Sequence, residues 1–193
     1  MDIVLRESDR LNETIRSFLA YARPQRASTS RMDVRQVITD TATLLQNNAE
    51  LIDGHRIEVD VPNDPVWYVA DANQIRQVVW NLATNGLRAM PNGGMLRLSA
   101  SGRGADATGP GEALIRVEDQ GVGIAPEELD GIFHPFRGGF EKGTGLGLAI
   151  VHRIVSDYGG EVHVTSQRGV GTRVDVTLPV TAPAADDARA TLN

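Results

Sequence analysis

Apolar residues recur at helical spacing in four segments of the chain and alternate with polar residues in six others. The segments with helical spacing are residues 2–22, 33–52, 72–90 and 146–158. The alternating segments, which we expect to be strands, are residues 55–62, 66–71, 94–101, 113–119, 161–167 and 172–179. Boundary residues support this division: Pro24 ends the first helix, Asp71 is suited to cap the third, and Gly159 and Gly160 stop the last.

Strands and helices are mixed along the chain, and neighbouring strands join as hairpins rather than as regular βαβ units. This order predicts an α+β fold: a two-layer sandwich with one mixed, mostly antiparallel sheet covered by helices on one face. The first helix has a narrow apolar stripe that needs a partner helix, either in its own domain or in a helical hairpin or dimer stem. Residues 24–32 are expected to be a polar linker, 126–133 to contain a short helical turn, and 181–193 to be a disordered tail.

The composition excludes several classes of function. The 193 residues carry a net charge of −6 without a dense Lys/Arg block, which argues against nucleic acid as the main partner. The absence of cysteine excludes disulfides, thiolate zinc sites and a cysteine nucleophile. No apolar run approaches the roughly 20 residues of a spanning helix, and the first ten residues lack the apolar middle of a signal peptide. We therefore expect a soluble, cytoplasmic protein.

The helix expected at 72–90 carries an unusual polar stripe. At about 100° per residue, Asn85 and Arg88 lie within an arc of roughly 60° that includes Asn81. Such a stripe often only faces water, but asparagine is a poor helix former and an uncommon choice for that purpose. An amide oxygen suits Mg²⁺ and an arginine suits a phosphate oxygen. The stripe thus suggests a site for a magnesium–polyphosphate ligand.

Two glycine-rich segments supply further candidate chemistry. The run "DQGVGI" leaves a strand with Asp119, Gly121 and Gly123, where a carboxylate can accept from an amine and glycines let backbone approach a flat ligand; an Asx-type turn is the alternative. The run "GTGLGLAIV", residues 143–151, leads into a helix start, where backbone N–H groups bind phosphate; a flexible hinge is the alternative. Its spacing matches neither the dinucleotide fingerprint nor a P-loop.

Taken in order, these segments resemble the ATP-binding catalytic domain of two-component sensor histidine kinases, within the ATPase superfamily that includes Hsp90, gyrase B and MutL. "NLATNGLRA" resembles the N box, "EDQGVGI" the G1 box, "IFHPF" the F box, "GTGLGLAI" the G2 box and "GVGT" the last glycine motif. The motifs most resemble those of nitrogen-regulation and pilus-regulation kinases. The resemblance implies the Bergerat ATP-binding fold for residues 33–180 and identifies residues 1–23 with the end of the second helix of the dimerisation and phosphoacceptor hairpin.

The resemblance also implies roles for individual residues. Asn85 would coordinate Mg²⁺, Arg88 would reach a phosphate, and Asp119 would accept from the adenine amine, directly or with a water that Thr172 shares. Residues 134–145 would form a mobile lid above Phe133 and Phe136. The implied cofactor-binding set is Asn81, Asn85, Arg88, Ala89, Asp119, Gly121, Gly123, Ile124, Phe133, Gly143, Thr144, Gly145, Leu146, Gly147, Leu148 and Thr172. The implied catalytic set is Asn81, Asn85, Arg88 and Lys142.

The sequence departs from the family pattern at several points. The lid lacks the usual Ser/Thr-rich run with a lysine, so Arg137 or Lys142 would have to substitute. His134 stands where an acidic residue is common, and Gly86 stands where alanine is usual, which lowers helix propensity by up to about 1 kcal/mol. An acceptor histidine followed by an acidic residue is expected on the first hairpin helix, and the four histidines, His55, His134, His152 and His163, lack that context.

The resemblance implies a kinase that takes Mg-ATP, phosphorylates a histidine on a dimerisation hairpin, and passes the phosphoryl group to an aspartate of a response-regulator receiver domain. It allows a homodimer through the N-terminal helix. Two alternatives stay open at this point. One is a Ser/Thr kinase of the anti-sigma type on the same fold, and the other is a non-catalytic nucleotide-binding module that docks partners.

Overall fold

The computed structural model describes residues 28–48, 50–103, 112–136 and 144–179. The strands are β1 (Ser30–Asp33), β2 (His55–Asp60), β3 (Trp67–Ala70), β4 (Gly94–Arg103), β5 (Glu112–Asp119), β6 (Glu161–Gln167) and β7 (Gly171–Pro179). The helices are α2 (Val34–Leu45), α3 (Ala72–Arg88), α4 (Pro126–Leu129) and α5 (Gly147–Asp157). The predicted N-terminal helix, the tail and most of the predicted lid lie outside the described residues.

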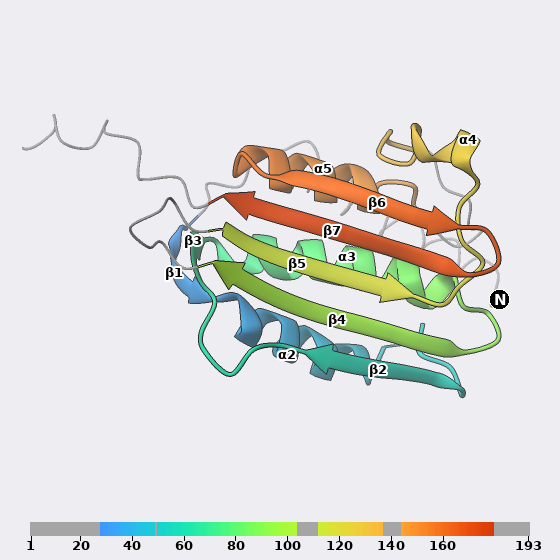
Figure 1. Ribbon diagram of the computed structural model, residues 1–193, viewed down its shortest axis with the longest axis horizontal. Coiled ribbons are helices and arrows are strands. Elements are labelled where there is room, and N and C mark those ends of the chain that lie inside the picture. Colours follow the sequence, from blue (N-terminus) through green and yellow to red (C-terminus); the bar gives the residue numbers. More distant parts are fainter. Residues whose placement is uncertain (1–27, 49, 104–111, 137–143, 180–193) are drawn as a thin grey trace, which may run out of the picture.

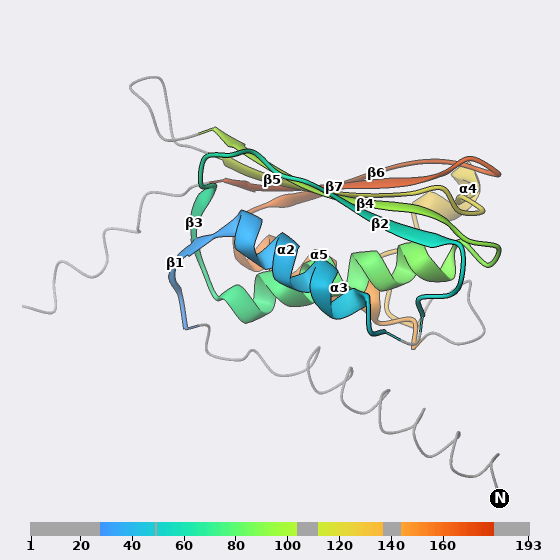
Figure 2. The same ribbon diagram turned by 90° about the horizontal axis from the view of Figure 1, so that it is seen from below.

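The described residues form two layers (Figures 1 and 2). A five-stranded sheet has the order β2-β4-β5-β7-β6, with β2 parallel to β4 and the other pairs antiparallel. Figure 2 shows α2, α3 and α5 together beneath one face of this sheet. The prediction of an α+β sandwich with a mixed, mostly antiparallel sheet is therefore confirmed.

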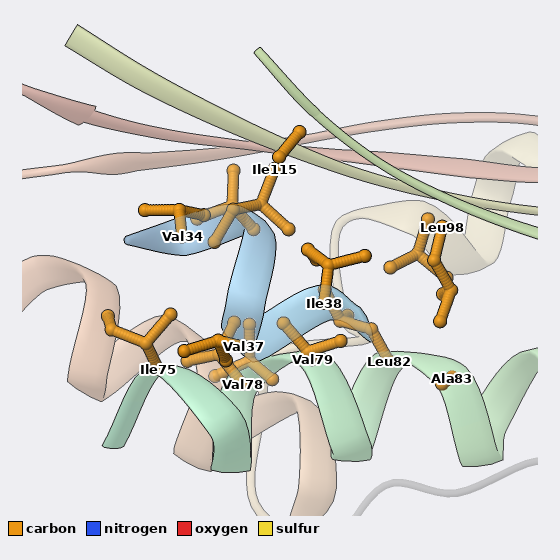
Figure 3. Packing of buried hydrophobic residues seen from close by; sticks show 14 of the residues in the cluster. Val34, Val37, Ile38, Ile75, Val78, Val79, Leu82, Ala83, Leu98 and Ile115 are labelled. Atoms are coloured by element: carbon orange, nitrogen blue, oxygen red, sulfur yellow. The ribbon is translucent and has the colours of Figure 1, made fainter. Parts of the chain in front are cut away.

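The core lies between the sheet and the three long helices, because the apolar side of each strand faces the apolar stripe of each helix. In Figure 3, Leu98 and Ile115 of the sheet lie above Ile38 of α2 and Val79 of α3. These four side chains are fully or almost fully buried. At about 1.5–3 kcal/mol for each fully buried aliphatic side chain, this layer is the main stabilising contribution to the fold.

The opposite face of the sheet has no helix over it among the described elements, and charged side chains alternate across its strands. Arg97 pairs with Glu58 at 3.2 Å, and Arg116 and Arg173 both pair with Asp175. Opposite charges on neighbouring strands stabilise such a face modestly, by about 0.2–1 kcal/mol per pair.

Two predicted segments differ in the structure. The helix predicted at 33–52 ends at Leu45, and the range predicted as a linker, 24–32, contains the start of β1, which pairs with β3 in a separate two-stranded sheet. Periodicity did not reveal β1 because its four residues are too few to show alternation. After Leu45 the chain turns at Asn47 and Asn48, residue types that compete with helical hydrogen bonds.

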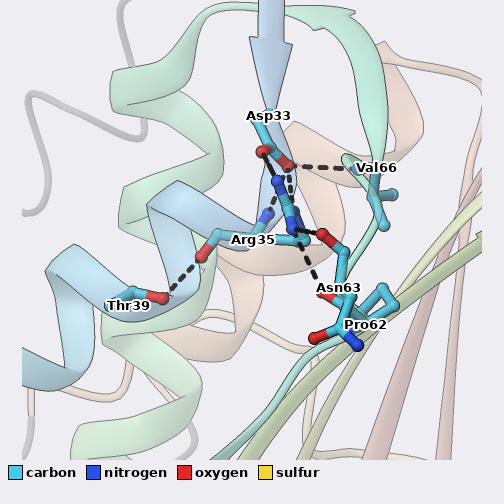
Figure 4. Close-up of polar contacts among 6 residues, drawn as sticks. All are labelled: Asp33, Arg35, Thr39, Pro62, Asn63 and Val66. Atoms are coloured by element: carbon cyan, nitrogen blue, oxygen red, sulfur yellow. Dashed lines mark hydrogen bonds and ion pairs between the residues drawn. The ribbon is translucent and has the colours of Figure 1, made fainter.

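Asp33 connects β1, α2 and the segment before β3 (Figure 4). Its carboxylate caps α2 by accepting from the Arg35 N–H at 3.1 Å, and it also accepts from the Val66 N–H at 3.1 Å. The Arg35 guanidinium bonds the same carboxylate at 2.8 Å and holds the pKa of Asp33 below its usual value of 3.8. Arg35 also donates to the carbonyl oxygens of Pro62 and Asn63, so one ion pair anchors three segments.

Candidate functional site

The two asparagines of α3 face the first residue of α5. The Asn81 amide donates from Nδ2 to the Gly147 carbonyl oxygen at 3.4 Å. A methyl group placed on Gly147 would lie 3.8 Å from both Asn81 Cγ and Asn85 Nδ2. The Asn85 amide makes no hydrogen bond to any described residue. The stripe therefore borders the glycine-rich start of α5 and leaves one amide available for a ligand.

The N-terminus of α5 also lacks a side-chain cap. Its N-cap is Leu146, which is fully buried and cannot accept a hydrogen bond through its side chain. The Leu146 N–H is bonded to Thr144 Oγ1 at 3.3 Å, while Gly147 and Leu148 begin the helix. The first N–H groups of a helix have no intrahelical partner and carry a partial positive charge. An anion is therefore favoured at this end of α5.

Asp119 ends β5, and only one of its two carboxylate oxygens accepts hydrogen bonds from the described residues. Oδ1 accepts from the Gly121 N–H at 2.8 Å and from the Thr172 N–H at 3.3 Å, and Thr172 is its direct partner on β7. Oδ2 accepts no hydrogen bond from a described residue. Burial raises the pKa of Asp119 above 3.8, and the two backbone hydrogen bonds oppose that shift without cancelling it. A partly desolvated carboxylate with a free oxygen is a strong acceptor for a ligand amine.

Close packing at Gly86 brings Asp119 next to α3, the helix that carries Asn81 and Asn85. A methyl group on Gly86 would lie 3.3 Å from Asp119 Cβ and only 2.7 Å from Leu96 Cδ1. Gly86 directly follows Asn85, so the carboxylate lies beside the same turn of α3 as the free amide. The glycine that departs from the family pattern thus has a structural reason, because the buried Leu96 fills the space of its missing side chain.

Gly121 continues this contact at the end of the helix. A methyl group on Gly121 would lie 2.5 Å from the Ala89 carbonyl oxygen, so only glycine fits without displacing backbone. The same oxygen accepts from the Val122 N–H at 2.9 Å. Ala89 therefore contributes backbone to the site, and it fixes the path of the chain that leaves Asp119.

Gly123 attaches this loop to the hairpin between β6 and β7. Its φ is +67°, and a methyl group there would lie 2.1 Å from the Gln167 carbonyl oxygen. The Ile124 N–H donates to Ser166 Oγ at 2.8 Å, and that hydroxyl lies 2.9 Å from Thr172 Oγ1. The hairpin thus braces the loop behind Asp119.

The F-box residues lie near the start of the predicted lid. The Phe133 ring lies 5.5 Å from the His152 ring of α5, centroid to centroid. Phe136 has a φ of +63°, donates its N–H to the Gly145 carbonyl oxygen at 2.9 Å, and is 65% exposed. Arg137, Lys142 and Gly143 lie outside the described residues, so their roles and the packing of Phe136 under a lid stay predictions.

Arg88 makes a contact that the sequence did not predict. Its guanidinium Nη2 lies 3.0 Å from Glu50 Oε1, in the segment between α2 and β2. Glu50 has no motif around it, so no sequence signal connected it with the site. Phosphate binding by Arg88 therefore stays a prediction that has to account for this ion pair.

The four histidines have no shared role. His55 accepts from the Ile52 N–H through Nδ1, and its Nε2 lies 2.8 Å from the Met90 carbonyl oxygen, which fixes the turn after α3. The other three side chains, His134, His152 and His163, are exposed. Among the described residues there is no group of three or more His, Cys, Asp and Glu that could hold a metal ion.

Comparison with known proteins identifies the family. A family model described as "Histidine kinase-, DNA gyrase B-, and HSP90-like ATPase" matches residues 70–182, a span that includes α3, Asp119 and the start of α5. The chain belongs to this ATPase family.

Curated and structural relatives agree with this assignment. Sporulation kinase D of Bacillus subtilis is 35% identical over 183 residues, which cover 93% of this chain and 34% of that protein. Sensor histidine kinase ZraS of Escherichia coli is 33% identical over 92% of this chain and 37% of its own length. Full-length ShkA, solved in complex with AMPPNP, superposes with a TM-score of 0.74 at 30% identity over 94% of this chain and 39% of that one.

The chain spans about a third of the length of these curated relatives. In the part that the structure describes, no helix is both long and apolar enough to span a membrane.

Proposed function

We propose that the chain binds Mg-ATP as the catalytic domain of a sensor histidine kinase. The observation that carries this proposal is the convergence of three features around one turn of α3: the Asn85 amide, the Asp119 carboxylate and the uncapped start of α5. The named relatives support the kinase class, and the AMPPNP in the ShkA complex, bound by that protein, supports ATP as the nucleotide.

Asp119 would recognise the base. Its free Oδ2 is an acceptor, so it suits the exocyclic amine of adenine and opposes the carbonyl oxygen that guanine carries at the same ring position. Gly121 and Gly123 lie directly against the backbone of Ala89 and Gln167, so they hold the loop after Asp119 in place beside α3 and the β6–β7 hairpin. Adenine is therefore preferred over guanine.

The asparagine stripe and α5 would hold the phosphates and their metal. The free Asn85 amide supplies one neutral oxygen, and Mg²⁺ is commonly held by a few protein oxygens with phosphate and water completing its shell. The described residues offer no carboxylate cluster for a metal alone, which fits an ion that arrives with the nucleotide. When bound, Mg²⁺ would neutralise charge on the phosphates, while Gly147 and Leu148 present N–H groups to them.

The reaction would transfer the γ-phosphoryl group to a histidine on a dimerisation hairpin. The imidazole lone pair forms the P–N bond as the bond to the bridging oxygen breaks, and ADP leaves with that electron pair. Phosphoryl transfer depends mainly on positioning and electrostatic stabilisation, which this site can supply without a covalent intermediate. A receiver domain of a response regulator would then take the phosphoryl group on an aspartate.

The experiment is to mix the chain with labelled ATP, Mg²⁺ and a hairpin that carries the acceptor histidine. We expect acid-labile, base-stable phosphate on the hairpin, and none with a hairpin whose histidine is replaced by glutamine. If the chain binds Mg-ATP but leaves the hairpin unlabelled, the kinase role is wrong. Acid-stable label on a serine-bearing partner would instead favour a Ser/Thr kinase.

A further inference from the structure

The segment between α2 and β2 is attached to the end of α3 at two points. Glu50 forms its ion pair with Arg88 at 3.0 Å, and His55 Nε2 lies 2.8 Å from the Met90 carbonyl oxygen. The histidine already fixes the turn through the hydrogen bonds of its two ring nitrogens. The ion pair therefore adds a charged contact to a helix end that is held independently.

The Arg88 guanidinium is poorly satisfied by this contact. An arginine has five N–H donors, and among the described residues Arg88 uses one of them, from Nη2 to Glu50. Its Nε is buried without a hydrogen-bond partner. The two side chains are 19% and 28% exposed, so water screens the pair only in part. The guanidinium thus has both the charge and the donors to bind a second anion.

Arg88 lies on the same stripe of α3 as the asparagines. It follows Asn85 by three residues, which places the two side chains as neighbours one turn apart on the helix surface. An anion held near Asn85 and the start of α5 therefore lies within the field of Arg88. The carboxylate of Glu50 opposes that field, because it neutralises the cation that the anion would approach.

We propose that Glu50 competes with the nucleotide phosphates for Arg88, and that this competition sets how strongly the site favours a triphosphate over a diphosphate. Glu50 acts through Arg88 and is a positioning residue. The proposal rests on the proposed function, because it needs a nucleotide at Asn85. Removing the Glu50 charge while keeping its shape leaves Arg88 as an uncompensated cation, which favours the ligand with more phosphate charge.

The test compares wild type with Glu50→Gln by calorimetric titration with Mg-AMPPNP and with Mg-ADP. The variant is expected to bind AMPPNP about three- to tenfold more tightly, the scale of one charged contact, and to gain less for ADP. The gain should shrink as salt is raised, because it is Coulombic. Glu58→Gln is the matched control, since Glu58 of β2 is paired with Arg97 of β4, and the loss of its charge should leave both affinities unchanged.

A double-variant cycle separates competition from a structural tether. In an Arg88→Gln background, Glu50→Gln should no longer change the ratio of the two affinities. If Glu50 only tethers its segment to α3, Glu50→Gln would lower the melting temperature and leave the ratio of AMPPNP affinity to ADP affinity as in wild type. That result overturns the proposal. Weaker AMPPNP binding by Glu50→Gln also overturns it. In both of those cases wild type still binds AMPPNP, and the proposed function stands. A wild-type chain that binds neither nucleotide overturns the proposed function and this inference together.

Discussion

Replacing Asp119 with asparagine separates ligand binding from stability at this site. In the variant, Oδ1 can still accept from the Gly121 and Thr172 N–H groups, so the turn after β5 keeps its hydrogen bonds. The free Oδ2 becomes an N–H₂ group, which would face the adenine amine with a donor. The change therefore removes the acceptor and leaves the surrounding geometry in place.

The expected loss of affinity follows from one charge-assisted hydrogen bond. Such a bond contributes about 1.5–3 kcal/mol, which corresponds to a factor of roughly 10 to 150 in the dissociation constant. Calorimetric titration of Mg-AMPPNP into wild type and Asp119→Asn measures it. Glu118→Gln is the control, because it removes the same charge from the adjacent residue of β5, one that is paired in register with Arg97 and Arg173.

The thermal stability of Asp119→Asn should stay the same or rise, whereas its nucleotide affinity falls. The pKa of Asp119 is raised above 3.8 in the folded chain, so the folded state holds this proton more tightly than the unfolded state. The free energy of unfolding therefore falls as the pH rises from 3.8 through the raised pKa, and ionised Asp119 costs stability at neutral pH. Asparagine has no such cost, so the variant should melt at or above the wild-type temperature at pH 7.

Two results would refute this reasoning. An affinity for AMPPNP equal to that of wild type would mean that the carboxylate does not contact the nucleotide. A clear fall in melting temperature at pH 7 would mean that the ionised carboxylate stabilises the fold, which contradicts the direction of its pKa shift.

Three further changes test other parts of the account. Asn85→Ala should abolish the gain in AMPPNP affinity that Mg²⁺ gives, measured by titration with and without the metal; an unchanged gain would place the metal elsewhere. Gly123→Ala should cost at least about 2 kcal/mol more than Gly169→Ala in chemical denaturation, because both glycines have positive φ but only the first would clash, with the Gln167 carbonyl oxygen; equal costs would contradict this packing. Tyr158→Phe should lose about 1–3 kcal/mol of unfolding free energy, because its hydroxyl bonds two groups at the start of α3, and an unchanged denaturation midpoint would argue against those bonds.

Periodicity predicted most of the fold because most elements are long and bury one face. The pattern predicts a helix over residues 72–90, and α3 is observed at Ala72–Arg88 with the predicted cap; the helix predicted over residues 146–158 is observed at Gly147–Asp157. The β6–β7 hairpin is also confirmed. The pairing of β1 with β3 could not be predicted, because partner choice between short strands depends on tertiary contacts that leave no local pattern.

Helical geometry likewise predicted part of the candidate site, and long-range packing determines the rest. Helical geometry placed Asn81 and Asn85 on one stripe, and the structure brings both to Gly147. The same geometry placed Arg88 beside them but could not reveal Glu50, which is 38 residues away in the chain and joins through packing. Gly86 packs against Leu96, which is also a long-range contact. The sequence alone therefore indicated only that Gly86 lowers helix propensity.

A crystal structure of the chain with Mg²⁺ and AMPPNP tests the account most directly. We predict the adenine amine within hydrogen-bond distance of Asp119 Oδ2, the metal on the Asn85 amide oxygen, and phosphate oxygens at the first N–H groups of α5. Nucleotide bound away from α3, or an adenine that faces the site without contacting Asp119, would contradict it.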